Sequence, residues 1–235
     1  MTEIYLIRHG QASFGTADYD RLSDLGRRQS LLLGRYWRRT RMDFGAVFAG
    51  PLRRHIETAR HVMAALASEK DSFSPRIIDE LEEIDTDRIL EIQHSRLLAD
   101  HPHLAAAYRR RHQDPDAYRR VMTLALEQNL SEGSAPAADD VFGRFVSSVQ
   151  RGLDRVAEAA VEMDRVAVFT SGGTIAAALQ TALNLDPTWA VELGWKILNT
   201  SVSVIETGDG RMGLNAFNLT AHLDLEADAG LKTLL

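Results

Sequence analysis

The chain has 235 residues, of which 45% are hydrophobic and 26% are charged, a balance typical of a globular protein with a large core. Its formal net charge of −6 argues against nucleic acid or an anionic membrane as the main partner, because clustered positive charge holds both. The absence of cysteine excludes disulfides, thiolate metal sites and a cysteine nucleophile. No apolar run approaches the roughly 20 residues of a membrane helix, and no signal segment is evident at the start, so we expect a cytoplasmic protein.

The first part of the chain predicts alternating strands and helices. Residues 4–7 form a short apolar run that ends at Arg8-His9-Gly10, which is typical of a buried strand that stops at a loop. After a polar loop, Ser23 is a candidate N-cap for a helix with apolar residues at helical spacing. A second strand is expected at residues 46–49, followed by an amphipathic helix from about 52 to 69.

The second part begins with a change of pattern. Residues 88–138 hold helical stretches rich in Arg, His and Gln that are interrupted by prolines, and we interpret them as a helical insertion. Asp139 or Asp140 can cap the next helix, and a third strand at 166–169 leads into Thr170-Ser171-Gly172-Gly173 and a further helix. Near the end, two strand-like runs flank Gly208-Asp209-Gly210, which predicts a hairpin.

This order of elements predicts an α/β fold. We expect a single domain over residues 1–235, built as a three-layer sandwich with a mostly parallel central sheet, helices on both faces and the insertion over the active site. Ligands of such sheets bind beyond the carboxyl ends of the strands. Three of the predicted strand ends carry Arg8-His9-Gly10, Gly50-Pro51 and Ser171-Gly172-Gly173.

The motifs at these strand ends resemble one known family. Gln11-Ala12-Ser13 continues the first strand end, and the run from Pro51 to Ala59 places Arg54 four residues before Thr58. Later segments that match in order are Leu81-Glu82-Glu83-Ile84, Asn199-Thr200-Ser201-Val202, Asn218 and Ala221-His222-Leu223. Together they resemble the histidine phosphatase superfamily, whose fold is like that of phosphoglycerate mutase. The resemblance covers nearly the whole chain outside the insertion.

The resemblance implies a metal-independent phosphomonoesterase without cofactors that acts on a small phosphorylated substrate. His9 would accept the phosphoryl group, since a neutral imidazole nitrogen can attack phosphorus and leave again when water arrives. Arg8 and Arg54 would hold the phosphate, because guanidinium groups bind its oxygens bidentately and stay charged. Glu83 would protonate the leaving oxygen, and Glu82 is an open alternative.

One position departs from the family pattern. The second histidine of the family should follow the late strand, directly before a glycine, and Ser171 stands there. Loss of one preorganised donor costs roughly 2.7 to 4 kcal/mol of transition-state stabilisation. Ser171 and Gly172 can still bind phosphate in a weaker form. His55, where alanine is common, could partly replace the missing imidazole, although packing of its helix is the favoured interpretation. The alternative is therefore a weakly active or inactive relative that binds a phosphorylated ligand or partner.

Other interpretations have less support. Basic runs such as Arg109-Arg110-Arg111 are typical of solvated helix faces in an acidic protein, so we do not expect nucleic-acid binding. The histidines of the insertion lack a known metal-ligand spacing, and we expect no metal. Thr170-Ser171-Gly172-Gly173 resembles a nucleophile elbow, but Phe169 stands where that motif needs glycine. The identity of the substrate and the oligomeric state cannot be read from the sequence.

Overall fold

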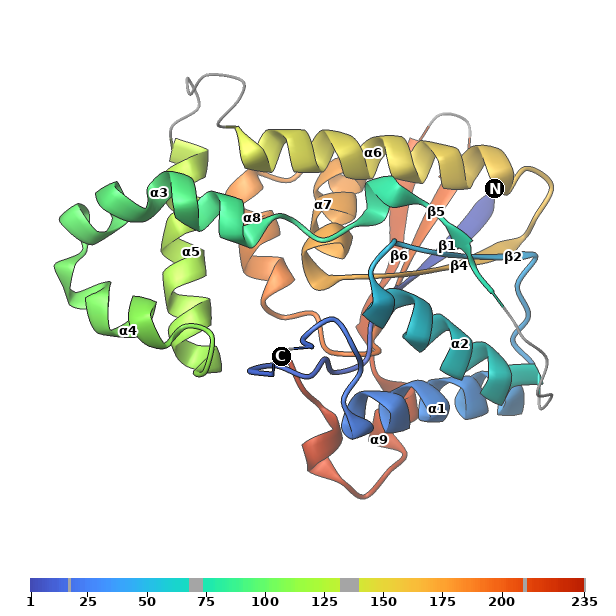
Figure 1. The fold of residues 1–235 in the computed structure, drawn as a ribbon. Coiled ribbons are helices and arrows are strands. Elements are labelled where there is room, and N and C mark those ends of the chain that lie inside the picture. The colour runs from blue at the N-terminus through green and yellow to red at the C-terminus, as the bar shows by residue number, and fades with distance from the viewer. Residues whose placement is uncertain (17, 68–73, 132–139, 209–210, 235) are drawn as a thin grey trace.

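The computed structural model describes residues 1–16, 18–67, 74–131, 140–208 and 211–234. Within these residues one sheet of six strands runs through the molecule in the order β3-β2-β4-β1-β5-β6 (Figure 1). The first four strands in the chain are mutually parallel where they pair, whereas β5 is antiparallel to both of its neighbours. The strands are β1 (Thr2–Arg8), β2 (Ala46–Ala49), β3 (Arg76–Ile77), β4 (Arg165–Thr170), β5 (Val202–Gly208) and β6 (Arg211–Leu219). The expected mostly parallel α/β fold is confirmed.

Helices cover both faces of this sheet. Helices α1 (Asp24–Arg39) and α2 (Arg53–Ala67) pack on one face, and α6 (Val141–Ala159) and α7 (Gly172–Leu183) pack on the other (Figure 1). Because successive strand residues point to opposite faces, Leu6 of β1 joins the core under α6 and α7, and Ile7 joins the core under α1 and α2. The strands β1, β2 and β4 are therefore largely buried on both sides, as their apolar runs predict, whereas β3 is exposed and β6 is mostly half-buried.

The predicted capping signals are present at two helix starts. The Ser23 hydroxyl accepts a hydrogen bond from the Gly26 amide at 3.0 Å, which confirms Ser23 as the N-cap of α1. At the start of α6, Asp140 accepts from the Gly143 amide at 2.8 Å, so Asp140 is the capping residue, while Asp139 lies outside the described residues. The predicted hairpin is formed by β5 and β6, although its turn at 209–210 is likewise outside the described part.

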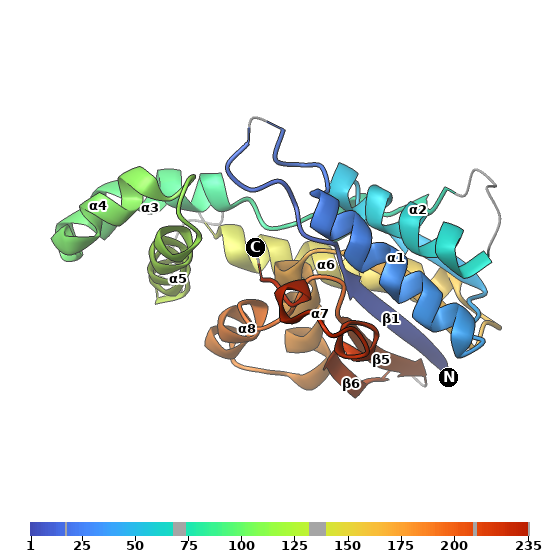
Figure 2. The same cartoon turned by 90° about the horizontal axis from the view of Figure 1, so that it is seen from below.

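The insertion forms a small helical layer beside the sheet. It contains α3 (Thr86–Asp100), α4 (Ala105–Arg110) and α5 (Pro115–Ser131), so that its first helix begins two residues earlier than the predicted 88. A separate apolar core joins these helices to α8 (Pro187–Gly194) and to the first turn of α6. In both views the insertion helices extend beyond the end of the sheet that lies away from the N-terminus (Figures 1 and 2).

Several short elements complete the chain. They are η1 (Asp79–Leu81), η2 (Pro102–Leu104), α9 (Ala221–Asp224) and η3 (Ala229–Leu231). No sequence pattern predicted α8 or the two-residue strand β3. Among the described residues, no helix combines the length and the apolar character that a membrane span needs.

Candidate active site

A cavity of about 390 Å³ opens where β1 and β4 end side by side. The two strands are parallel, so their carboxyl ends meet at one edge of the sheet, and the His9 amide bonds to the Thr170 carbonyl there at 2.8 Å. The N-terminal turn of α2 lies at the same edge. As a result Arg8, His9 and Arg54, which are far apart in the sequence, all line this cavity.

The ring of His9 is held in one tautomer. Its Nδ1 lies 2.7 Å from the Gly10 carbonyl, which can only accept, so Nδ1 carries the proton. Its Nε2 lies 3.2 Å from Nε of Arg54, which can only donate, so Nε2 offers a lone pair. Burial, reinforced by the charges of Arg54 and Arg8, lowers the pKa of His9 well below its ordinary value of 6.5. His9 is therefore neutral at physiological pH, with its unprotonated Nε2 toward Arg54.

Arg8 is a nearly buried cation with an unused donor. Its Nη1 donates to the carbonyl of Ile197, whereas its Nε is buried and has no hydrogen-bond partner among the described residues. Burial lowers the pKa of Arg8, and the nearby Glu83 carboxylate opposes that shift. A buried, unpaired donor on a cation in a cavity wall is a ready contact for an anion.

Arg54 is oriented by the loop that follows β1. Its Nη1 donates to Asp20 Oδ1 at 2.8 Å, and its guanidinium lies 5.4 Å from the centre of the Tyr19 ring. Asp20 also accepts from the Arg53 amide at 2.9 Å, which ties the loop to the first turn of α2. Asp20 and Tyr19 therefore fix the direction of Arg54. The sequence analysis did not assign Asp20 a role, because an acid in a polar loop gives no signal by itself.

Two adjacent glutamates reach the cavity. Glu83 is partly buried; its Oε1 accepts from the Ile84 amide at 2.9 Å, and its Oε2 accepts from the Gly173 amide at 3.3 Å. Glu82 is exposed, and its carbonyl accepts from the Thr174 hydroxyl at 2.7 Å. Both residues line the cavity. The contact with Gly173 holds the Glu83 carboxyl at the start of α7 beside the other residues of the cavity.

A profile of the histidine phosphatase superfamily (branch 1) matches residues 4–220. The chain belongs to this superfamily. No curated protein matches it at the level of sequence.

Solved structures of histidine phosphatases and a mutase have the same fold. A phosphoserine phosphatase mutant from Entamoeba histolytica, in complex with phosphoserine, is 20% identical with a TM-score of 0.61 over 95% of this chain and 100% of that one. A phosphoglycerate mutase from Bacillus anthracis is 15% identical, with a TM-score of 0.61 over 95% of both chains. A mycobacterial glucosyl-3-phosphoglycerate phosphatase in complex with VO3 is 20% identical, with a TM-score of 0.56 over 94% and 100%. At these identities the likeness concerns the fold.

Ser171, expected in place of the superfamily's second histidine, is placed differently from a phosphate ligand. Its side chain is fully buried, does not line the cavity, and has its hydroxyl 2.6 Å from Nε2 of His55. The His55 ring comes from α2 and lies 5.7 Å, centre to centre, from the His9 ring. In this conformation the Ser171 hydroxyl pairs with His55, and Ser171 does not line the cavity. Gly172, the other expected phosphate contact on this loop, does line it.

Late motifs of the superfamily hold the loop that carries His9. The Asn199 amide group donates to the His9 carbonyl at 3.1 Å, and the Thr200 amide donates to the Arg8 carbonyl at 3.0 Å. The Thr200 hydroxyl pairs with Nε2 of the buried His222 at 2.9 Å. Thr58 of α2 accepts from the Gly10 amide at 3.0 Å. These residues support the site rather than form its surface.

The remaining cavity wall includes residues that the sequence did not name individually, some of them from the insertion that was expected over the active site. The insertion contributes Tyr118, Met122 and Leu126 of α5, and Trp195 and Leu234 come from the segments after α8. No spacing rule links these residues to His9, so only the folded chain reveals them.

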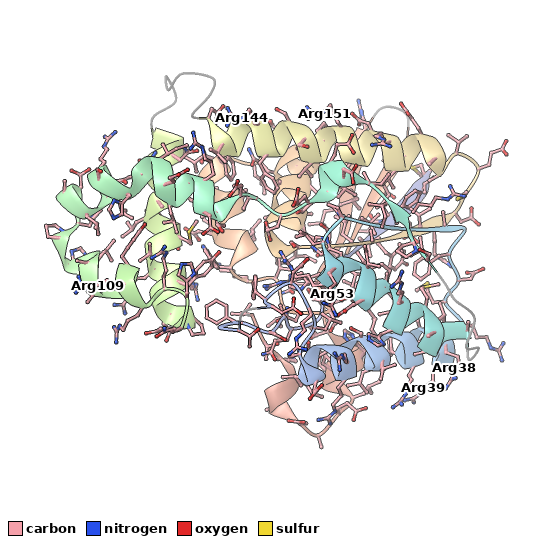
Figure 3. The ribbon with its side chains drawn as sticks, viewed as in Figure 1. Arg38, Arg39, Arg53, Arg109, Arg144 and Arg151 are labelled. Atoms are coloured by element: carbon pink, nitrogen blue, oxygen red, sulfur yellow. The ribbon has the colours of Figure 1, made fainter. Side chains whose placement is uncertain are left out.

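Several arginines away from the site lie on different helices. Figure 3 shows Arg38 and Arg39 together at the end of α1, Arg109 on α4, and Arg144 and Arg151 along α6. The described residues also contain no group of three or more histidine, aspartate or glutamate side chains that could hold a metal ion.

Proposed function

We propose that this protein is a cytoplasmic, metal-independent phosphomonoesterase that forms a phosphohistidine at His9 and acts on a small phosphorylated substrate. The observation that carries the proposal is the convergence of three groups on one cavity. They are the unprotonated Nε2 of His9, the Arg54 guanidinium bonded to it, and the unpaired Nε of the nearly buried Arg8.

In the first step, the Nε–H group of Arg54 exchanges its hydrogen bond to Nε2 of His9 for one to a phosphoryl oxygen, and the lone pair of Nε2 attacks the phosphorus atom of the ester. An N–P bond forms as the bond from phosphorus to the alcohol oxygen breaks, and Glu83 gives its proton to the departing oxygen so that neutral alcohol leaves. Arg8 and Arg54 bind the phosphoryl oxygens and stabilise the charge that develops on them. Donation from Nδ1 of His9 to the Gly10 carbonyl keeps the ring oriented and delocalises the positive charge it gains.

In the second step, water attacks the phosphohistidine. The Glu83 carboxylate left by the first step takes a proton from that water, the O–P bond forms and the N–P bond breaks. Inorganic phosphate leaves, His9 is again neutral and Glu83 is again protonated. The low pKa of His9 favours this step, because a weakly basic imidazole is a good leaving group.

The proposal predicts phosphatase activity on p-nitrophenyl phosphate that survives EDTA and is lost in His9→Ala. The nucleophile is a side chain without metal ligands, so chelation has no effect, and removal of the ring removes the acceptor. The measurement is release of p-nitrophenol together with labelling of the protein by 32P-phosphate ester. His103→Ala, which removes an exposed histidine of the insertion, is the matched control and keeps both signals. Activity that chelation abolishes, or that persists in His9→Ala, contradicts the proposal.

A second candidate function is binding of a phosphorylated ligand without turnover. It is favoured by Ser171, which stands at the position of the second histidine and has its hydroxyl held by His55. That function predicts saturable binding of vanadate or phosphate, measured by calorimetry and lost in Arg54→Ala, with no labelling of His9. Labelling of His9 by a phosphate ester excludes it.

A further inference from the structure

We propose that the cavity selects phosphate monoesters whose alcohol part is neutral and apolar or aromatic, and that it discriminates against esters carrying a second anionic group. This inference rests on the proposed phosphatase function and names the class of substrate for the same site.

The cavity wall beyond His9 is largely apolar. Apart from the phosphate-facing groups, apolar and aromatic side chains dominate it, and they come from four different parts of the fold. They include Leu52 beside α2, Met122 and Leu126 of α5, Phe142 of α6, Val191 of α8 and Trp195. Contact with an apolar alcohol removes this surface from water, which stabilises the complex by about 25 cal/mol for each Å² buried.

The charged residues around the cavity disfavour a second anionic group on the substrate. The only described Lys or Arg side chains that line it are Arg8 and Arg54, and both are assigned to the phosphoryl group. Glu82, Asp85 and Asp87 line the cavity as well and are acidic. A carboxylate or second phosphate on the substrate would therefore face like charges without a counter-charge, which costs affinity. Arg119 lies 6.0 Å from the Trp195 ring but does not line the cavity.

An aromatic pair in the cavity wall also favours an aromatic alcohol. Tyr118 and Trp195 meet edge to face with ring centres 6.3 Å apart, and both line the cavity. Burial raises the pKa of Tyr118, so its phenol stays neutral throughout the physiological range. The indole Nε1 of Trp195 is buried and has no hydrogen-bond partner among the described residues. The pair offers ring surfaces and one neutral donor, which suits an aromatic alcohol better than an anion.

The experiment compares benzyl phosphate with 4-carboxybenzyl phosphate. The two esters have the same reacting group and nearly the same leaving-group basicity, and they differ by one remote carboxylate. We expect the wild-type kcat/KM to be at least about tenfold higher for benzyl phosphate. The binding constants to His9→Ala, measured by calorimetry, should show a preference in the same direction without depending on turnover.

A charge variant at the rim tests the cause of the preference. Asp87 is exposed on the first turn of α3, and Asp87→Lys should reduce the preference about three- to fivefold by favouring the carboxylated ester. Glu127→Lys makes the same change of charge on α5 at an exposed position outside the cavity lining, and should leave the ratio unchanged. Thermal melting checks that both variants fold.

The outcomes separate this inference from the proposed function. Equal rates, or faster hydrolysis of the carboxylated ester, overturn the inference while the phosphatase function stands. Tighter binding of benzyl phosphate to His9→Ala, without phosphate release by the wild type, supports the inference and overturns the function. If neither ester is bound or hydrolysed, both fail. An equal change of the ratio in Asp87→Lys and Glu127→Lys overturns the explanation by local charge.

Discussion

At the level of single residues, Ser171 pairs with His55 at the end of β4. The sequence resemblance places Ser171 where the superfamily has its second histidine, and in the structure an imidazole from α2 lies beside it. Burial first, and then the charge of Arg54, lowers the pKa of His55 well below its ordinary value, so this ring is neutral. It completes the packing behind His9 but supplies no charged donor to the cavity.

Ser171→His alone should therefore not restore a strong site. The serine side chain has no exposed surface and its hydroxyl lies 2.6 Å from His55, so a larger ring overpacks the site at a cost of about 1 to 3 kcal/mol. The double variant His55→Ala with Ser171→His provides the room. We expect it to phosphorylate His9 faster than the wild type, with an upper bound of about a thousandfold set by the usual worth of one donor.

The measurement is single-turnover phosphorylation of His9 in a double-mutant cycle. Strong coupling is expected, with both single variants slower than the wild type and the double variant faster. If the effects of the two substitutions on the phosphorylation rate are additive, then His55 does not occupy the space that a histidine at position 171 would need. If the double variant folds normally but is not faster than the wild type, the site does not lack a donor at this position.

At the scale of elements, the start of α7 controls the proposed acid. A Cβ atom added at Gly173 would overlap Oε1 of Glu83, so Gly173→Ala displaces that carboxyl although alanine is otherwise the better helix former. We expect a loss of about ten- to a hundredfold in kcat for benzyl phosphate. The loss should be much smaller for p-nitrophenyl phosphate, whose leaving group needs no acid.

Gly143→Ala is the matched control for this variant. At Gly143 an added Cβ would overlap the carboxylate of Asp140, the N-cap of α6, and that carboxylate does not line the cavity. This variant should lose about 1 kcal/mol of stability, as caps usually provide, and keep its rates on both esters. Equal rate losses on the two esters in Gly173→Ala would show a general disturbance rather than a displaced acid.

Much of the element pattern could be predicted from the sequence because it depends on local signals. Apolar runs, a serine cap and a Gly-Asp-Gly turn identify β1, α1 and the β5–β6 hairpin within one or two residues. In contrast, α8 and β3 are short, and their stability comes from neighbours that no local pattern reveals. The superfamily motifs predicted Arg8, His9 and Arg54 as parts of one phosphate site, and the three residues line one cavity. The pairing of Ser171 with His55 depends on packing that only the fold determines.

At the scale of the whole molecule, buried neutral histidines make stability depend on pH. Burial lowers the pKa of His222 to about 4 in the folded protein, against an ordinary value of 6.5 in the unfolded chain. Between these two values the unfolded chain binds more protons, so stability falls as pH decreases from 6.5 to 4. The loss from His222 amounts to about 3 kcal/mol at pH 4.

His222→Gln removes this contribution and should flatten the dependence of the unfolding free energy on pH between 6.5 and 4. Denaturant unfolding at several pH values measures the slope. His103→Gln, which changes an exposed histidine of η2, should leave the slope as it is in the wild type. A slope in His222→Gln that equals that of the control would mean that His222 is not held neutral by burial. His9 and His55, with pKa values lowered in the same direction, account for further loss in acid.

The hydrogen bonds that hold the His9 loop also determine when the site can form during folding. The carbonyls of Arg8 and His9 are held by Asn199 and Thr200, about 190 residues later, and Thr200 is held in turn by His222. Contacts of such large sequence separation are slow to form, because most of the chain must be ordered before they can close. During synthesis, His9, the proposed nucleophile, therefore leaves the ribosome about 190 residues before Asn199, which holds its loop, and the geometry of the site is completed only after that.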